Sequence, residues 1–161
     1  MSPVRNKRVS GSKLSGRVLV SVIDLQKKIP VDPEKIKKLA LCIFSAESKK
    51  KTGQVSICFV SDGYIKKLNR LYHSRNSSTD VLSFDISADK DRYLSDIFIS
   101  TDTAISNSKI FKTTPLYEMF LYVAHGVLHI AGCGDIDPKD RKVMRKKELR
   151  YLKAADYLGT L

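Results

Sequence analysis

His125, His129 and Asp135 are the residues of this chain whose types and spacing are best suited to chemistry. The two histidines are four residues apart, so on a helix both rings project from one face and can reach one ion. Gly132 and Gly134 follow, and their backbone freedom lets the helix end and the chain fold Asp135 back. Three ligands leave one coordination position open, as in catalytic zinc sites, where a bound water becomes a nucleophile. The segment therefore predicts one divalent metal ion, Zn²⁺ or another.

Gly126 separates this segment from the HExxH zinc peptidases. Those enzymes carry a glutamate directly after the first histidine as general base, and glycine cannot replace it, so a peptidase is disfavoured. Two other interpretations stay open. The histidines could be hydrogen-bonded residues of a core helix, or the same three ligands could hold the iron of an oxygenase, although no cosubstrate anchor is recognisable. Cys133 lies inside the loop as a packing residue or a fourth ligand, and packing is the simpler role.

The charge of the chain points to a polyanionic partner. The 161 residues carry a formal net charge of +12. Residues 1–16 contain four basic residues and no acid, which leaves 25 basic and 17 acidic residues, a net +8, in the remainder. Nucleic acid is the leading candidate for such a partner. A face of the last expected helix is also strongly basic and suits a phosphate backbone: Lys139, Arg141, Lys142, Arg145, Lys146, Lys147 and Arg150.

The three cysteines, Cys42, Cys58 and Cys133, are widely spaced and form no CxxC pair. This spacing argues against a disulfide framework and favours a reducing compartment, so we expect a cytoplasmic protein. Cys42 and Cys58 lie in apolar stretches and are expected in the core. The longest apolar stretch, residues 116–133, is interrupted by Glu118, two histidines and two glycines. No membrane span is therefore expected.

The hydrophobic pattern predicts a disordered basic tail over residues 1–16 and one domain over residues 17–161. Three N-cap residues followed by proline, Asp32-Pro33, Thr114-Pro115 and Asp137-Pro138, predict three helix starts. The expected strands are 18–23, 54–60, 81–84 and 97–100, and the expected helices are 33–45, 64–71, 101–110, the helix from 115 that carries both histidines, and the helix from 138.

These elements indicate an α+β fold in which a small mixed sheet of about four strands is covered by about five helices, with the metal site at the end of a central helix. A polar loop is expected over residues 73–78. The last helix should turn an apolar stripe inward, namely Met144, Tyr151, Leu152, Ala155 and Leu158.

Three segments in the same order resemble one family, the YbeY endoribonucleases. The segment from His125 to Asp135 is similar to the family's HGxLHLxGYDH. Residues 79–84 match its TDVLSF strand, and residues 96–100 resemble its GDIxIS strand, with Ser95 where glycine is usual. Further positions also agree with the family pattern: Leu68, Asn69, Tyr72, Glu118, Met144 and Glu148.

The resemblance implies a metal-dependent endoribonuclease that prefers single-stranded RNA and acts in ribosomal RNA maturation and ribosome quality control, with the small ribosomal subunit as partner. It also implies that the loop before the TDVLSF strand serves the scissile phosphate, with His73 and Arg75 as catalytic residues and Arg75 and Thr79 as substrate-binding residues. An rRNA-binding assembly factor with a structural metal is the alternative within the same setting.

Two positions depart from the family pattern. Asp135 stands where the third ligand is histidine, and an anionic ligand lowers the charge of the site and should acidify a bound water less. His73 stands where the family has arginine, with Arg75 two residues further on. A histidine could serve the phosphate only when protonated, or act as general acid or base, while Arg75 supplies the lost charge.

Several polar residues have a simpler expected role in ordering the backbone. Asp80 and Ser83 should order the start of their strand. Glu118 lies in the first turns of its helix, where a carboxylate is favoured by the helix dipole. Asp137 is expected to be an N-cap.

Overall fold

A computed structural model describes residues 17–50 and 52–157. Along the chain these residues form β1 (Val18–Asp24), α1 (Pro33–Glu47), β2 (Thr52–Val60), α2 (Asp62–His73), β3 (Val81–Asp85), β4 (Arg92–Ser100), α3 (Thr101–Phe111), α4 (Pro115–Ile130) and α5 (Pro138–Tyr157). The expected α+β class, with four strands and five helices in this part of the chain, is confirmed. The expected tail, residues 1–16, and Leu158 lie outside the described residues.

Helix starts follow the predicted capping residues. The Asp32 carboxylate accepts hydrogen bonds from the backbone N–H groups of Glu34 and Lys35 at the start of α1. The Thr114 hydroxyl accepts one from the backbone of Tyr117 at the start of α4. Asp137 accepts one from the N–H of Asp140, 2.9 Å away, which confirms it as an N-cap.

The sheet has the order β1-β2-β4-β3. β1 and β4 flank β2 in parallel, while β3 pairs antiparallel with β4 at the edge. β4 begins at Arg92, five residues before the expected start, because β4 pairs with β2 along its whole length, from Arg92 beside Thr52 to Ser100 beside Val60. This pairing buries Tyr93 and Ser95 and leaves Leu94 between them exposed, so the sequence shows no apolar-polar alternation that would reveal this part of the strand.

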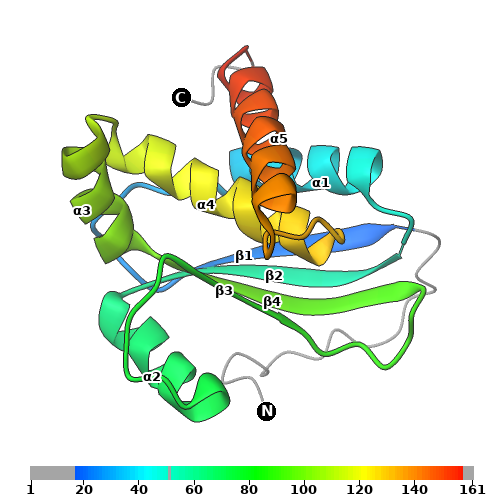
Figure 1. Ribbon diagram of the computed structural model, residues 1–161, viewed down its shortest axis with the longest axis horizontal. Coiled ribbons are helices and arrows are strands. Elements are labelled where there is room, and N and C mark those ends of the chain that lie inside the picture. The colour runs from blue at the N-terminus through cyan, green and yellow to red at the C-terminus, as the bar shows by residue number, and fades with distance from the viewer. Residues whose placement is uncertain (1–16, 51, 158–161) are drawn as a thin grey trace.

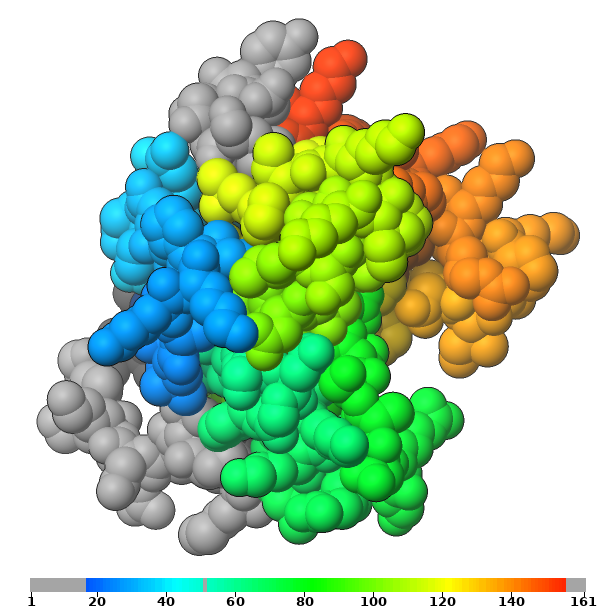
Figure 2. Space-filling view, turned by 90° about the vertical axis from the view of Figure 1, so that its left-hand side faces the viewer, coloured from blue at the N-terminus to red at the C-terminus, as the bar shows by residue number. Residues whose placement is uncertain are grey.

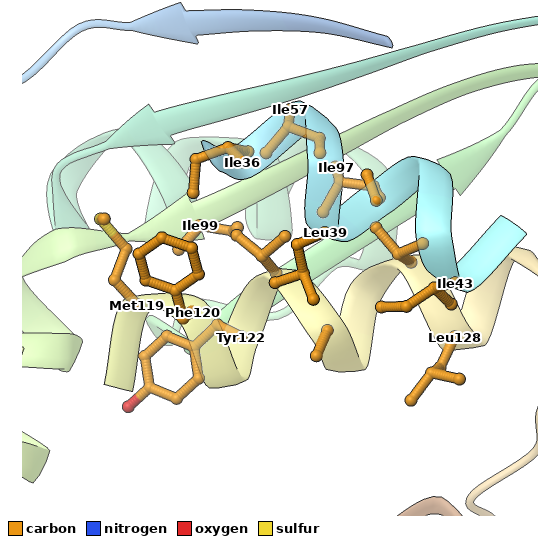
Figure 3. Packing of buried hydrophobic residues seen from close by; sticks show 14 of the residues in the cluster. Ile36, Leu39, Ile43, Ile57, Ile97, Ile99, Met119, Phe120, Tyr122 and Leu128 are labelled. Carbon is orange, nitrogen blue, oxygen red and sulfur yellow. The ribbon is translucent and has the colours of Figure 1, made fainter. Parts of the chain in front are cut away.

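Helices cover the sheet unequally. Figure 1 shows α1 and α4 on one face of the sheet and α2 on the other. The larger core lies between the first face and those two helices, and Figure 3 shows Ile36 and Ile43 of α1 in one cluster with Ile57 and Ile97 of the sheet and with side chains of α4. Each such fully buried side chain contributes roughly 1.5–3 kcal/mol to folding. α4 is therefore the central helix that the sequence predicts.

The last helix, α5, packs against α4 and α1. Its apolar stripe is buried at Met144, Tyr151, Leu152 and Ala155, as expected. In Figure 2 the first turns of α5, in orange, project from the side of the molecule. No helix in the described ranges is long and apolar enough to cross a membrane.

Two local expectations are wrong. Cys42 is exposed on α1, because the buried stripe of that helix consists of Ile36, Leu39, Ala40, Ile43 and Phe44 and passes beside it. His73 belongs to the last turn of α2 rather than to the following loop. Ser74 follows as the C-cap of the helix, with a left-handed backbone (φ 53°), and its N–H donates to the carbonyl of Asn69.

Candidate metal centre

α4 carries both histidines across the sheet at a point of unusually close approach. A Cβ atom on Gly126 would lie 2.8 Å from Cγ2 of Ile97 and 3.2 Å from Cγ1 of Val81. Any larger residue at this position would have to displace the side chains of Ile97 and Val81. The structure thus gives the physical reason for the absence of the peptidase glutamate, since this position faces the sheet and not the site.

His125 is held between two carboxylates from different segments. Its Nδ1 lies 2.6 Å from Oε1 of Glu148 on α5, and its Nε2 lies 3.4 Å from Oδ2 of Asp135. The Glu148 side chain is only 8% exposed, and its other oxygen lies 3.3 Å from Nη1 of Arg145. A carboxylate that accepts from one ring nitrogen fixes the orientation of the ring and leaves the other nitrogen available to an ion.

The surrounding charges favour a cation at His125. The hydrogen bond to Glu148 raises the pKa of His125, burial of the ring opposes this, and the negative charges of Glu148, Asp80 and Asp135 raise the pKa further. A site that stabilises a proton on an imidazole in this way also stabilises a metal ion that replaces the proton.

His129 lies one turn further along α4, with its ring parallel to that of His125 within 5°. Its Nδ1 is 3.3 Å from the carbonyl oxygen of Cys133. The loop turns back at this point through Gly132, whose φ of 105° is accessible to glycine, and the N–H of Cys133 donates to the carbonyl of Leu128. Both histidines therefore have their Nδ1 atoms engaged and their Nε2 atoms available.

The types of the three side chains fit a metal ion, but only His125 and Asp135 lie at the spacing that two ligands of one ion require. Two ligands of a tetrahedral zinc ion lie about 3.3 Å apart, which agrees with the separation of His125 and Asp135. The two ring centroids are 6.4 Å apart, wider than the roughly 5 Å that one tetrahedral ion requires. Within the described ranges no three His, Cys, Asp or Glu side chains are close enough to hold an ion in these positions. His129 would have to turn towards its neighbours.

Comparison with known proteins identifies the family. Residues 21–156 match the family described as endoribonuclease YbeY. The chain belongs to this family. An endoribonuclease YbeY of Carboxydothermus hydrogenoformans is 32% identical over 138 residues, which cover 84% of this chain and 96% of that protein. One of Parabacteroides distasonis is 37% identical over 103 residues, 64% of this chain and 72% of the relative. A solution structure of a Thermotoga maritima protein superposes with a TM-score of 0.62 at 26% identity, over 85% of this chain and 89% of that chain.

The residues that the resemblance to the YbeY family assigns to the RNA phosphate lie around a second feature, which we call the Arg75 cavity. It has a volume of about 460 Å³ and is lined by Asn69, His73, Arg75, Ser77, Ser78, Thr79, Val81 and Leu82. The structure therefore brings together His73, Arg75 and Thr79, which come from the end of α2 and the following loop. Val81 lines this cavity and also touches the position of Gly126, so the cavity adjoins α4 beside His125.

The loop of the Arg75 cavity is anchored to the fold. The buried side-chain amide of Asn69 donates to the backbone carbonyl of Ser77, and the backbone carbonyl of Asn69 accepts from the N–H of Arg75. The His73 ring stacks on Phe84, with centroids 5.7 Å apart and planes within 10°. This stacking fixes the ring plane, so His73 presents its edges to the cavity.

The residues with simpler expected roles mostly fill them. Asp80 accepts hydrogen bonds from the hydroxyl of Thr79 and from the N–H of Val81, so it orders the start of β3. It also adds to the negative charge around His125, a role that local sequence reasoning missed. Glu118 is 3% exposed and accepts a hydrogen bond from Thr113 at the start of α4.

Glu148 is part of the candidate centre, and sequence reasoning alone assigned it no role there. It agrees with the family pattern, but it lies 23 residues from His125 on another helix, and only the packing of α5 on α4 joins them. Cys133 Sγ lies 3.6 Å from Nζ of Lys147. The thiol therefore has a hydrogen-bonding role other than that of a fourth ligand.

Proposed function

We propose that this protein is a metal-dependent endoribonuclease that prefers single-stranded RNA and acts in the cytoplasm on ribosomal RNA, during maturation and quality control of the small ribosomal subunit. One observation carries the proposal. In a member of the endoribonuclease YbeY family, Nε2 of His125 lies at ligand spacing from Asp135 while Glu148 holds its Nδ1. A ring fixed in this way is what a catalytic metal requires, and a purely structural histidine does not need it.

The residues that would hold the ion are His125, His129 and Asp135. A bound Zn²⁺ or similar divalent ion would polarise a phosphoryl oxygen or lower the pKa of a water. The protein supplies the remaining parts. Glu148 accepts the Nδ1 proton of His125 and so keeps Nε2 free of a proton and aimed at the ion. The Cys133 carbonyl does the same for His129.

The Arg75 cavity is the proposed site for the RNA phosphate next to the centre. Arg75 offers a permanent positive charge with several donors, which suits phosphate. His73 either donates to the phosphate when protonated or moves a proton at the leaving or attacking oxygen. The Thr79 hydroxyl, already ordered by Asp80, adds one further hydrogen bond.

The proposal is tested with protein purified without added metal. Elemental analysis of the folded parent should find about one divalent ion per chain, and this measurement also separates zinc from iron. His129→Ala should lose the ion and the cleavage of single-stranded RNA together. His73→Ala should keep the ion and cleave more slowly, because His73 lies in the Arg75 cavity and not among the ligands.

The alternatives make different predictions in the same experiment. If the metal is structural, a chelator should lower the melting temperature, and the protein should show no metal-dependent cleavage before chelation. An enzyme should lose cleavage on chelation while its RNA affinity and melting temperature stay nearly unchanged. Equal metal content in His129→Ala and the parent would disprove the assignment of the ligands.

A further inference from the structure

A second and larger cavity lies on the other side of the turn that follows α4. Its volume is about 950 Å³. Its walls are the end of α1, the starts of β2 and β4, the turn of residues 130–133, and Lys147 of α5. We call it the lysine cavity. None of its residues lines the Arg75 cavity, so the two cavities are separate features of the surface.

Four of the residues that line this cavity are lysines, and only two are acids. Lys147 is paired with Glu47, and Lys50 lies 3.6 Å from an oxygen of Asp85, so these two charges are partly neutralised. Lys49 and Lys90 are exposed, and neither makes an ion pair within the described residues. The carboxylate of Asp91 offsets part of this charge, and the cavity keeps a net positive charge that Lys49 and Lys90 supply.

The interior of the lysine cavity suits phosphate rather than a base. Its aromatic residue, Tyr93, is 3% exposed. The ammonium group of Lys50 lies 5.0 Å from the centre of the Tyr93 ring, and the Tyr93 hydroxyl is hydrogen-bonded to Ser48. No aromatic face in this lining is open for base stacking, so recognition here would be through charge and without sequence preference.

The lysine cavity and the candidate metal centre share two structural elements. Lys147 and Glu148 are neighbours on α5, and the first reaches into the cavity while the second holds His125. Cys133 contacts both sides, with its carbonyl at 3.3 Å from Nδ1 of His129 and its thiol beside Lys147. A chain bound at the metal centre can therefore continue directly into the lysine cavity.

We infer that the lysine cavity is a second RNA subsite, in which Lys49 and Lys90 bind backbone phosphates of the strand as it extends from the metal centre, on the side opposite to the Arg75 cavity. This inference rests on the proposed function, since it extends the path of the same substrate. It predicts that binding depends on the length of the strand and is independent of its sequence. Each phosphate contact with a single strand contributes about 0.7 to the slope of log affinity against log salt.

The test compares two double variants that remove the same amount of charge. Lys49→Glu/Lys90→Glu changes the lysine cavity, and Lys27→Glu/Lys38→Glu changes two exposed lysines that line neither cavity. Affinity for a single-stranded RNA of about 20 nucleotides is measured at several salt concentrations. A chelator is present during the measurement, so that metal-dependent cleavage does not interfere with binding. The melting temperature of each variant verifies its folding.

In Lys49→Glu/Lys90→Glu the salt slope should fall by about 1.4 and affinity at low salt should fall by roughly tenfold. When metal is restored, this variant should show a raised KM and a kcat within about twofold of the parent, because the ligands are untouched. The control variant should change neither quantity to a comparable extent. This combination supports the subsite.

Two results would overturn it, and they can be told apart. If the parent binds RNA with a steep salt slope and cleaves it, while both double variants behave alike, the cavity is only a solvated surface and the proposed function stands. If the parent itself neither binds nor cleaves RNA, the proposed function fails and the subsite fails with it.

Discussion

Replacing Glu148 should weaken the metal site without changing any ligand. The carboxylate lies 2.6 Å from Nδ1 of His125 and is nearly buried, so it both orients the ring and raises its basicity. Loss of such a partner typically costs 10–100-fold in metal affinity, or about 1.4–2.7 kcal/mol. We expect this full loss for Glu148→Ala and a smaller one for Glu148→Gln, which keeps an oxygen to accept the Nδ1 proton.

The size of the effect should depend on pH, and the direction follows from the pKa of His125. The hydrogen bond to Glu148 is the main cause of the raised pKa, so the parent suffers stronger competition from protons than the variant does. The affinity ratio of parent to variant should therefore be largest near pH 8 and should narrow as the solution is acidified. Titration of the metal-free proteins with zinc against a competing chelator measures this ratio.

Glu34→Ala is the matched control for Glu148→Ala. Glu34 is an exposed carboxylate on α1 that pairs with Lys37, so its loss should leave metal affinity unchanged at every pH. Equal zinc affinity of Glu148→Ala and the parent at pH 8 would refute the argument, because a carboxylate that orients a ligand cannot be removed at no cost. A ratio independent of pH would refute only the part that assigns the raised pKa to Glu148.

Three further predictions concern the ligands, acid stability and the helix crossing. Asp135→His makes the site more positive by one charge, so the rising limb of the pH–rate profile should move to lower pH, and an unchanged profile with metal retained would exclude Asp135 as a rate-setting ligand. The hydrogen bond from Lys28 and then that from the N–H of Asp62 lower the pKa of Asp102 from 3.8, so its contribution to stability is present above that pH and is lost as pH falls through the folded pKa. Below about pH 4, the melting temperature of Asp102→Asn should therefore fall less with decreasing pH than that of the parent. Gly126→Ala should destabilise by up to about 2 kcal/mol, since overpacking against Ile97 costs roughly 1–3 and helix propensity returns about 1. Gly63→Ala is its control, because the new Cβ would lie 3.9 Å from the Ser61 hydroxyl oxygen, an ordinary contact distance, and chemical denaturation should show no loss of stability.

The elements of this fold could be predicted where local chemistry decides them. Asp32 and Thr114 accept hydrogen bonds at the starts of α1 and α4, as their position before proline predicts. The strand order β1-β2-β4-β3 could not be predicted. It depends on whether β3 or β4 pairs with β2, and no local signal encodes that choice. The exposed position of Cys42 shows the same limit, since a residue in an apolar stretch can still lie beside the buried stripe of its helix.

The candidate centre also has a part that the sequence predicts and a part that depends on tertiary structure. His125 and His129 could be paired from their spacing, because a single helix fixes that relation. Glu148 comes from another helix and Asp80 from the start of β3, so their approach to His125 depends on tertiary packing. The 6.4 Å separation of the two rings also depends on side-chain torsions that the spacing leaves free.

The distribution of charge connects the two halves of the proposed mechanism. The chain as a whole is strongly basic, yet His125 is surrounded by the negative charges of Glu148, Asp80 and Asp135. Such a centre attracts a divalent cation and repels a phosphate, while Arg75 on one side and Lys49 on the other attract the phosphates of a strand. An ion at the centre would neutralise the carboxylates that oppose the substrate. The acidic centre and the basic flanks are therefore compatible, because a bound ion would remove the repulsion between the centre and the RNA phosphates.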